Sequence, residues 1–144
     1  MLNGLGDTAE IEEWCRDLRR RFAVALTFHP ANLASPDEIA AMMAEAERAF
    51  GRVDIVVNNA VTRNFAPIDD LPVEAWDDAL AVNLSSAFHT TRLALPGMKR
   101  RNFGRIINMA SAYGLLGAAD RVDYVTTKTG LLGLTRATAI ELAD

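Results

Sequence analysis

A tyrosine and a lysine lie four residues apart in the segment DYVTTKTG, at Tyr124 and Lys128. Residues at i and i+4 share one face of a helix, so the two side chains can act on the same atoms. Removal of the proton from a secondary alcohol needs a base, and a phenol with a reference pKa of about 10 is a poor base at neutral pH. A nearby ammonium favours the phenolate. Alone, this spacing is weak evidence, because two common residues fall four apart by chance in many helices, and only further residues at the same place can turn it into a hypothesis of proton transfer by Tyr124 assisted by Lys128.

Other polar residues are expected at the same edge of a sheet. Ser111 ends the predicted strand 104–111, and the asparagines of NNA end the predicted strand 53–60. Ligand crevices of open α/β sheets lie at these carboxyl ends. There a serine hydroxyl can donate to an oxygen that gains negative charge. Asn83 lies inside an apolar helix, where its amide is costly unless it is hydrogen-bonded.

Two other kinds of chemistry are disfavoured. Ser111 lies in MASAY rather than in a G-x-S-x-G turn, and no histidine follows it, which argues against a hydrolase nucleophile. Cys15, His29 and His89 are scattered along the chain without metal-ligand spacing, and a single cysteine forms no internal disulfide. The sequence therefore predicts no metal site.

Length and composition indicate an ordinary globular chain. With 144 residues, of which 50% are hydrophobic, it predicts a single domain over 1–144. The net charge of −4 argues against nucleic acid or an anionic membrane as partner. No signal peptide and no apolar run near 18 residues is evident, so we expect a cytoplasmic protein.

The apolar positions change period repeatedly, as alternating helices and strands require. The segment from Ser35 to Gly51 has an N-cap serine, proline at the first helical position and a terminal glycine. Pro96 and Gly97 could kink or restart the long helix. The full prediction is helices at 8–21, 35–51, 73–101 and 123–142, strands within 22–33, 53–60 and 104–111, and loops at 1–7 and 112–121. This order predicts βαβ units, with a parallel sheet and helices on both faces.

In order and spacing, NNA, VNLSS, INMAS and YVTTK closely resemble the short-chain dehydrogenase/reductase family over essentially the whole chain. LNGLGD, AEIE, NLSSAFHTTRLALPGM and GRIINMAS resemble the branch that oxidises 3-hydroxybutyrate. The resemblance implies that a small hydroxy acid and its ketone are interconverted with NAD, with NADP left open. It makes Tyr124 the acid/base and Ser111 the holder of the substrate oxygen. Lys128 would tune the tyrosine and bind the nicotinamide ribose, and Asn83 would anchor a proton-relay water.

The same resemblance implies binding residues. The cofactor side comprises Leu5, Asn32, Leu33, Asn59, Ala60, Val61, Tyr124 and Lys128. The family usually has aspartate at Asn32, beside the adenine, and glycine at Val61, where valine adds a branched side chain. The substrate side comprises Arg63, Ser111, Tyr113 and Arg121. In the hydroxybutyrate branch, the residues that contact the substrate carboxylate look like a glutamine at the position of Arg63, a histidine at that of Tyr113 and a lysine at that of Arg121.

The family's glycine-rich turn for the pyrophosphate is missing. NGLGDTA contains Gly4 and Gly6 but no third glycine, and it resembles the segment that follows the second strand. We therefore expect a partial Rossmann-like doubly wound sheet that lacks the first βα unit and the C-terminal strands. The chain alone is expected to bind NAD(H) weakly.

Two alternatives stay open. One is a 3-oxoacyl thioester reductase of the same family, which differs in its substrate lid. The other is a non-catalytic fragment or assembly module, because the helices at 73–101 and 123–142 resemble those through which the family forms homo-oligomers, and an unpaired strand edge promotes association.

Overall fold

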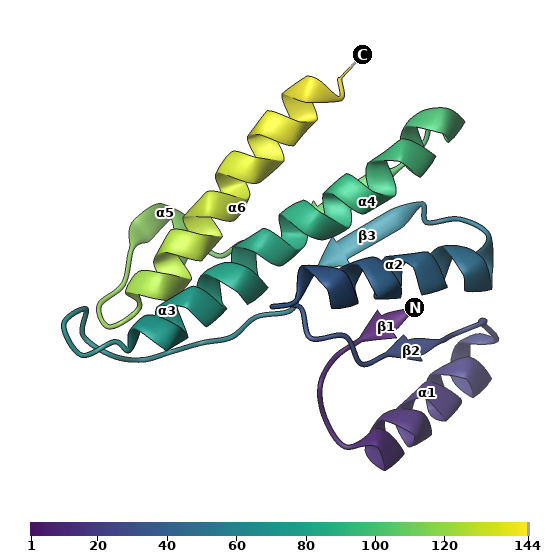
Figure 1. Ribbon diagram of the computed structural model, residues 1–144, viewed down its shortest axis with the longest axis horizontal. Helices are drawn as coiled ribbons and strands as arrows, with labels where there is room; N and C mark the ends of the chain where they lie inside the picture. Colours follow the sequence, from purple (N-terminus) through teal and green to yellow (C-terminus); the bar gives the residue numbers. More distant parts are fainter. Residues whose placement is uncertain (144) are drawn as a thin grey trace.

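The computed structural model describes residues 1–143, which form four short strands and a series of helices (Figure 1). The strands are β1 (Leu2–Asn3), β2 (Phe28–His29), β3 (Ile55–Asn58) and β4 (Arg105–Asn108). The helices are α1 (Thr8–Phe22), α2 (Pro36–Phe50), α3 (Val73–Leu80), the π-helical turn η1 (Ala81–Ser85), α4 (Ser86–Arg101), α5 (Tyr113–Leu116) and α6 (Val122–Glu141).

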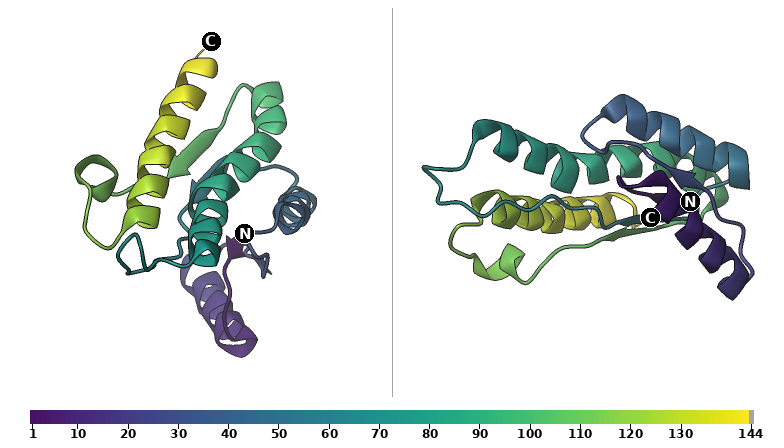
Figure 2. Two further views of the ribbon diagram at one scale, coloured as in Figure 1. Left: turned by 60° about the vertical axis from the view of Figure 1, so that its left-hand side comes forward. Right: turned by 90° about the horizontal axis from the view of Figure 1, so that it is seen from below.

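The strands form two parallel pairs. β1 pairs with β2, and β3 pairs with β4, with Asn58 opposite Asn108 at the carboxyl end. Within residues 1–143 the two pairs are not hydrogen-bonded to each other. One apolar cluster joins them, because Met1 and Ala31, next to β1 and β2, pack in the same cluster as Ile39 of α2 and Val56 of β3. Helices α1 and α2 lie on opposite sides of the β1–β2 pair (Figures 1 and 2).

The first strand was expected to be a loop, and that prediction is wrong for Leu2 and Asn3. The Asn3 amide donates to the carbonyl oxygens of His29 and Ala31 at 3.0 and 2.9 Å. The Leu2 N–H donates to the Thr27 carbonyl at 2.8 Å. Two residues are too few to show a strand period, so only these long-range bonds identify the strand.

Helix α2 follows its sequence signals closely. The Ser35 hydroxyl accepts from the Glu38 N–H at 3.3 Å, and the Glu38 carboxylate accepts from the Asn32 N–H at 2.8 Å. Gly51 ends the helix with a φ of 77°, a left-handed conformation that glycine adopts without strain. The prediction of this helix is confirmed.

The predicted helix at 73–101 is irregular at a different place from the one that the sequence predicts. Pro96 lies inside an unbroken α4, so no restart occurs at Pro96 and Gly97. The irregularity lies earlier, in the π turn from Ala81 to Ser85, and π turns are frequent at functional sites. The predicted loop at 112–121 is wrong in part, because Tyr113–Leu116 forms the short helix α5.

A chain of polar side chains ties the second strand pair to two helices. The Thr90 hydroxyl of α4 donates to the Asn58 Oδ1 at 2.8 Å, and the Asn58 amide donates to the Asn108 Oδ1 at 2.8 Å. The Asn108 amide then donates to the hydroxyl of Thr135 on α6 at 2.9 Å. Because these groups are satisfied together, they fix α4 and α6 relative to the strand ends.

The other face of the β3–β4 pair is apolar and open. Ile55, Val57 and Ile107 are 57%, 55% and 46% exposed, whereas Val56 is buried beneath the helices. Across the described residues, no helix combines the length and apolar character needed to cross a membrane.

We predict that the 144-residue chain self-associates through this face, because exposed apolar strands promote association. Val57→Lys should lower the mass measured by light scattering without changing the circular dichroism spectrum. Trp14→Lys, at an exposed apolar residue of α1, is the matched control and should leave the mass unchanged. A monomeric wild-type chain would contradict the prediction.

Candidate active site

Helix α6 presents Tyr124 and Lys128 on one face, as their spacing predicts. Both are buried, and the Lys128 Nζ lies 5.7 Å from the centre of the Tyr124 ring. The ammonium donates to the Met109 carbonyl oxygen at 2.5 Å. Met109 follows β4 and lies two residues before Ser111, so this bond joins the pair to the serine-bearing segment.

Burial lowers the pKa of the Lys128 ammonium from its ordinary value of 10.5. Tyr124 opposes the shift, and the nearby charge of Arg63 adds to it. The lysine is thus a desolvated cation beside a phenol.

Helix α5 brings the serine segment against α6. A Cβ added to Gly114 would lie 3.0 Å from the carbonyl carbon and oxygen of Lys128, so only glycine permits this approach. The Thr129 hydroxyl donates to the Gly114 carbonyl at 2.9 Å. The Ser111 hydroxyl oxygen accepts from the Tyr113 N–H at 3.2 Å, which places both predicted residues on this turn.

Asn83 lies in the π turn η1 and is buried. Its Oδ1 accepts from the Thr62 N–H at 2.8 Å, and its Nδ2 donates to the Thr62 carbonyl at 3.0 Å and to the Thr127 hydroxyl at 3.4 Å. Both amide hydrogens are therefore used. A water held by Asn83 would have to use the remaining lone pair of Oδ1 or the backbone carbonyl.

The segment after β3 is extended and pinned at three alternate residues. Thr62 is held by the Asn83 amide. The Asn64 amide donates to the buried Asp123 carboxylate at 2.8 Å, and the Ala66 N–H donates to the Asp120 carbonyl at 3.2 Å. Arg63 and Phe65, which alternate with these residues, are exposed.

Two arginines lie beside the tyrosine. The Arg63 Cζ lies 6.0 Å from the centre of the Tyr124 ring, and the Arg121 Cζ lies 5.5 Å from it. The Arg121 guanidinium also stacks on Phe65, with Cζ 3.6 Å from that ring centre. Three cations, Arg63, Arg121 and Lys128, thus surround one phenol.

The predicted cofactor residues follow the carboxyl ends of three strands. Leu5 follows β1, Asn32 and Leu33 follow β2, and Asn59, Ala60 and Val61 follow β3. The arrows of β1 and β3 point toward the end of the molecule where α6 begins (Figure 1). The predicted cofactor residues thus follow strands of which β1 and β3 have their carboxyl ends toward the start of α6.

The predicted dinucleotide site is supported only in part. Tyr124 and Lys128, the predicted ribose contacts, lie together on α6. At the N-terminus of α1, however, the Asp7 carboxylate accepts from the N–H groups of Ala9 and Glu10 at 2.9 and 3.0 Å. An acidic cap at this helix start repels a pyrophosphate, so α1 offers it no binding site.

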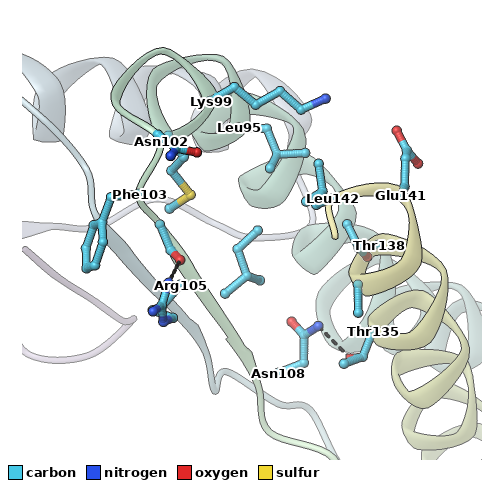
Figure 3. Close-up of a pocket in the computed structure, with 14 residues that line it drawn as sticks. Leu95, Lys99, Asn102, Phe103, Arg105, Asn108, Thr135, Thr138, Glu141 and Leu142 are labelled. Atoms are coloured by element: carbon cyan, nitrogen blue, oxygen red, sulfur yellow. Dashed lines mark hydrogen bonds between the residues drawn. The ribbon is translucent and has the colours of Figure 1, made fainter. Parts of the chain in front are cut away.

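A cavity of about 810 Å³ lies elsewhere, between α4, β4 and the end of α6 (Figure 3). Its lining includes Met98, Phe103, Asn108, Thr135 and Leu142 but none of the predicted site residues. Because the residues that carry the predicted chemistry do not line it, we assign it no catalytic role. Among the described residues, no cluster of three or more histidine, cysteine, aspartate or glutamate side chains could hold a metal ion.

Comparison with known proteins decides the family. Residues 5–144 match the short chain dehydrogenase family. The chain belongs to this family. It is 46% identical to the D-beta-hydroxybutyrate dehydrogenase of Cupriavidus necator, a match that covers 100% of this chain and 55% of that protein. The chain thus spans about half the length of this curated relative.

Solved structures agree on the fold. A metagenomic short-chain oxidoreductase in complex with NADP has a TM-score of 0.91 and 31% identity, over 99% of this chain and 64% of that one. An NAD⁺-bound xylitol dehydrogenase has a TM-score of 0.87 and 28% identity, over 95% and 53% of the two chains. The prediction of a partial Rossmann-like doubly wound α/β fold is confirmed.

Sequence reasoning missed the residues that hold the site in place, namely Thr62, Asn64, Asp123 and Thr127. A carboxylate at Asp123, directly before the tyrosine in the first turn of α6, was the available signal. It could not identify Asn64 as the partner, which lies 59 residues earlier.

Replacing Lys128 by methionine should stabilise the fold at neutral pH, because a buried charge is removed. Between the lowered pKa of Lys128 and 10.5, the unfolded chain binds more protons than the folded one, so wild-type stability rises with pH there. The advantage of Lys128→Met should therefore shrink between pH 7 and pH 10 in urea unfolding. Lys99→Met, at an exposed lysine, should show no such trend. An advantage that grows with pH would contradict the assigned cause.

Asn83→Ala should destabilise the protein by roughly 1–3 kcal/mol, because the Thr62 N–H and carbonyl lose their partner. Urea unfolding measures the loss. The exposed Asn59→Ala should change stability by less than about 0.5 kcal/mol. Equal effects of the two variants would show that the Asn83 bonds contribute little.

Proposed function

We propose that this chain forms the catalytic part of a nicotinamide-dependent oxidoreductase that interconverts a small hydroxy acid, similar to 3-hydroxybutyrate, and its ketone. The observation that supports this best is the Tyr124–Lys128 pair on α6, with Lys128 bonded to the segment that leads to Ser111. Membership of the short chain dehydrogenase family and the 46% identity to a hydroxybutyrate dehydrogenase support the reaction and the substrate class.

The bound nicotinamide would supply the hydride acceptor. Tyr124 then takes the hydroxyl proton of the alcohol, and the Lys128 ammonium favours the phenolate that does so. The Ser111 hydroxyl donates to the substrate oxygen and positions it. In the reverse direction Tyr124 returns the proton, so one residue serves as acid and base.

The rest of the proposed machinery follows the predicted roles. Lys128 and Tyr124 would bind the nicotinamide ribose, with Leu5, Asn32, Leu33, Asn59, Ala60 and Val61 along the adenosine side. NAD and NADP both remain candidates, since the two structural neighbours contain one each. Arg63, Tyr113 and Arg121 would contact the carboxylate side of the substrate. We also propose a homo-oligomer, formed through the long helices α4 and α6.

Tyr124→Phe should abolish turnover and leave cofactor affinity nearly unchanged, because only the transferable proton is lost. General acid–base catalysis is typically worth about 10²- to 10⁴-fold in rate. The assay follows NADH formation from 3-hydroxybutyrate by the protein that contains these residues, and NADH fluorescence titration measures affinity. Retention of more than about a tenth of wild-type kcat would reassign the acid/base role.

A parallel assay with a 3-oxoacyl thioester separates the alternative reductase. Turnover of the thioester without turnover of 3-hydroxybutyrate would replace the proposed substrate class but keep the role of Tyr124. Absence of both activities would favour the non-catalytic module.

A further inference from the structure

Two guanidinium groups face the tyrosine without an acidic partner. Arg63 and Arg121 come from different segments, yet both lie within 6.0 Å of the Tyr124 ring centre. Among residues 1–143, the ion pairs within 4.0 Å involve neither of them. The pair is therefore available to anions from outside the chain.

Hydrogen bonds fix the backbone on both sides of Arg63. Arg63 lies between Thr62, which the Asn83 amide holds, and Asn64, which bonds to Asp123 at 2.8 Å. Arg121 stacks its face on Phe65 at 3.6 Å. The N–H donors of a guanidinium lie in its plane, so stacking leaves the donor edge open to a carboxylate.

The neighbouring carboxylate does not neutralise this charge. Asp123 is 1% exposed, and its Oδ2 accepts from the Asn64 amide at 2.8 Å rather than from Arg63. Arg63 adds to the lowering of the Lys128 pKa that burial mainly causes, so its charge reaches the catalytic pair. An anion on Arg63 would relieve that repulsion.

One carboxylate pairs bidentately with one guanidinium and would leave the other without a partner. We propose that Arg63 and Arg121 each bind one carboxylate of a hydroxy dicarboxylate, and that the site prefers such a substrate to a hydroxy monocarboxylate. This proposal rests on the proposed oxidation of an alcohol at Tyr124.

The test compares three secondary alcohols that differ in charge and size: 3-hydroxybutyrate, 3-hydroxyglutarate and the monomethyl ester of 3-hydroxyglutarate. The ester matches the diacid in shape but has one carboxylate fewer. A charge-assisted bond contributes about 1.5–3 kcal/mol, so kcat/KM for the diacid should exceed that for the ester by about 10- to 100-fold. Added salt should reduce that ratio.

Arg63→Gln should lower kcat/KM for the diacid by about 10- to 100-fold more than it lowers kcat/KM for the monomethyl ester, because only one guanidinium then remains for two carboxylates. Arg100→Gln, at an exposed arginine of α4, is the matched control and should leave the ratio unchanged. A ratio near one, or a ratio that Arg63→Gln leaves intact, overturns the proposal while the proposed oxidation stands.

A binding experiment tests the proposal even if the protein oxidises none of the alcohols. Glutarate and its monomethyl ester, which lack the hydroxyl group, are compared by the thermal shift they give the protein. Stronger stabilisation by glutarate that Arg63→Gln abolishes supports the two-carboxylate site even if no alcohol is oxidised. Equal shifts overturn it. Absence of oxidation of all three alcohols refutes the proposed function separately.

Discussion

The buried amide of Asn83 is the interaction on which the site depends. From one π turn it reaches the backbone of Thr62 through both its donor and its acceptor, and it also reaches the Thr127 hydroxyl on α6. Three segments that are distant in the sequence are joined by one side chain. A buried amide without these partners would cost free energy, so the π turn, the segment after β3 and α6 are constrained to adopt their positions together.

The same physical device recurs at the strand ends. Asn58 and Asn108 face each other across β3 and β4, and threonines of α4 and α6 complete their hydrogen bonds. Apolar packing between helices tolerates small shifts, but a hydrogen-bond network has few arrangements that satisfy every group. The face of α6 that carries Tyr124 and Lys128 is therefore fixed at two places, by Thr127 beside the pair and by Thr135 two turns later.

Local signals predicted local features well. The caps at Ser35 and Gly51 gave α2 correctly, and the spacing of Tyr124 and Lys128 gave their common face. Features set by distant partners were not predictable. Strand β1 exists through bonds from Asn3 to residues 26 and 28 positions away, and the Asn64–Asp123 bond spans 59 positions. The spacing of apolar residues within one segment has no information about such distant partners. For the same reason, the sequence predicts regular helix where the π turn lies.

The site carries positive charge that the adjacent carboxylate does not neutralise. Arg63, Arg121 and Lys128 surround Tyr124, and burial already lowers the pKa of Lys128. The adjacent carboxylate, Asp123, is turned into the fold and bonded to Asn64. At the N-terminus of α1, by contrast, the Asp7 carboxylate already accepts the hydrogen bonds from the N–H groups of Ala9 and Glu10 that a bound anion would use. Anion binding is thus disfavoured at α1 and favoured beside the tyrosine, so the charge distribution directs an acidic ligand toward the proposed acid/base residue.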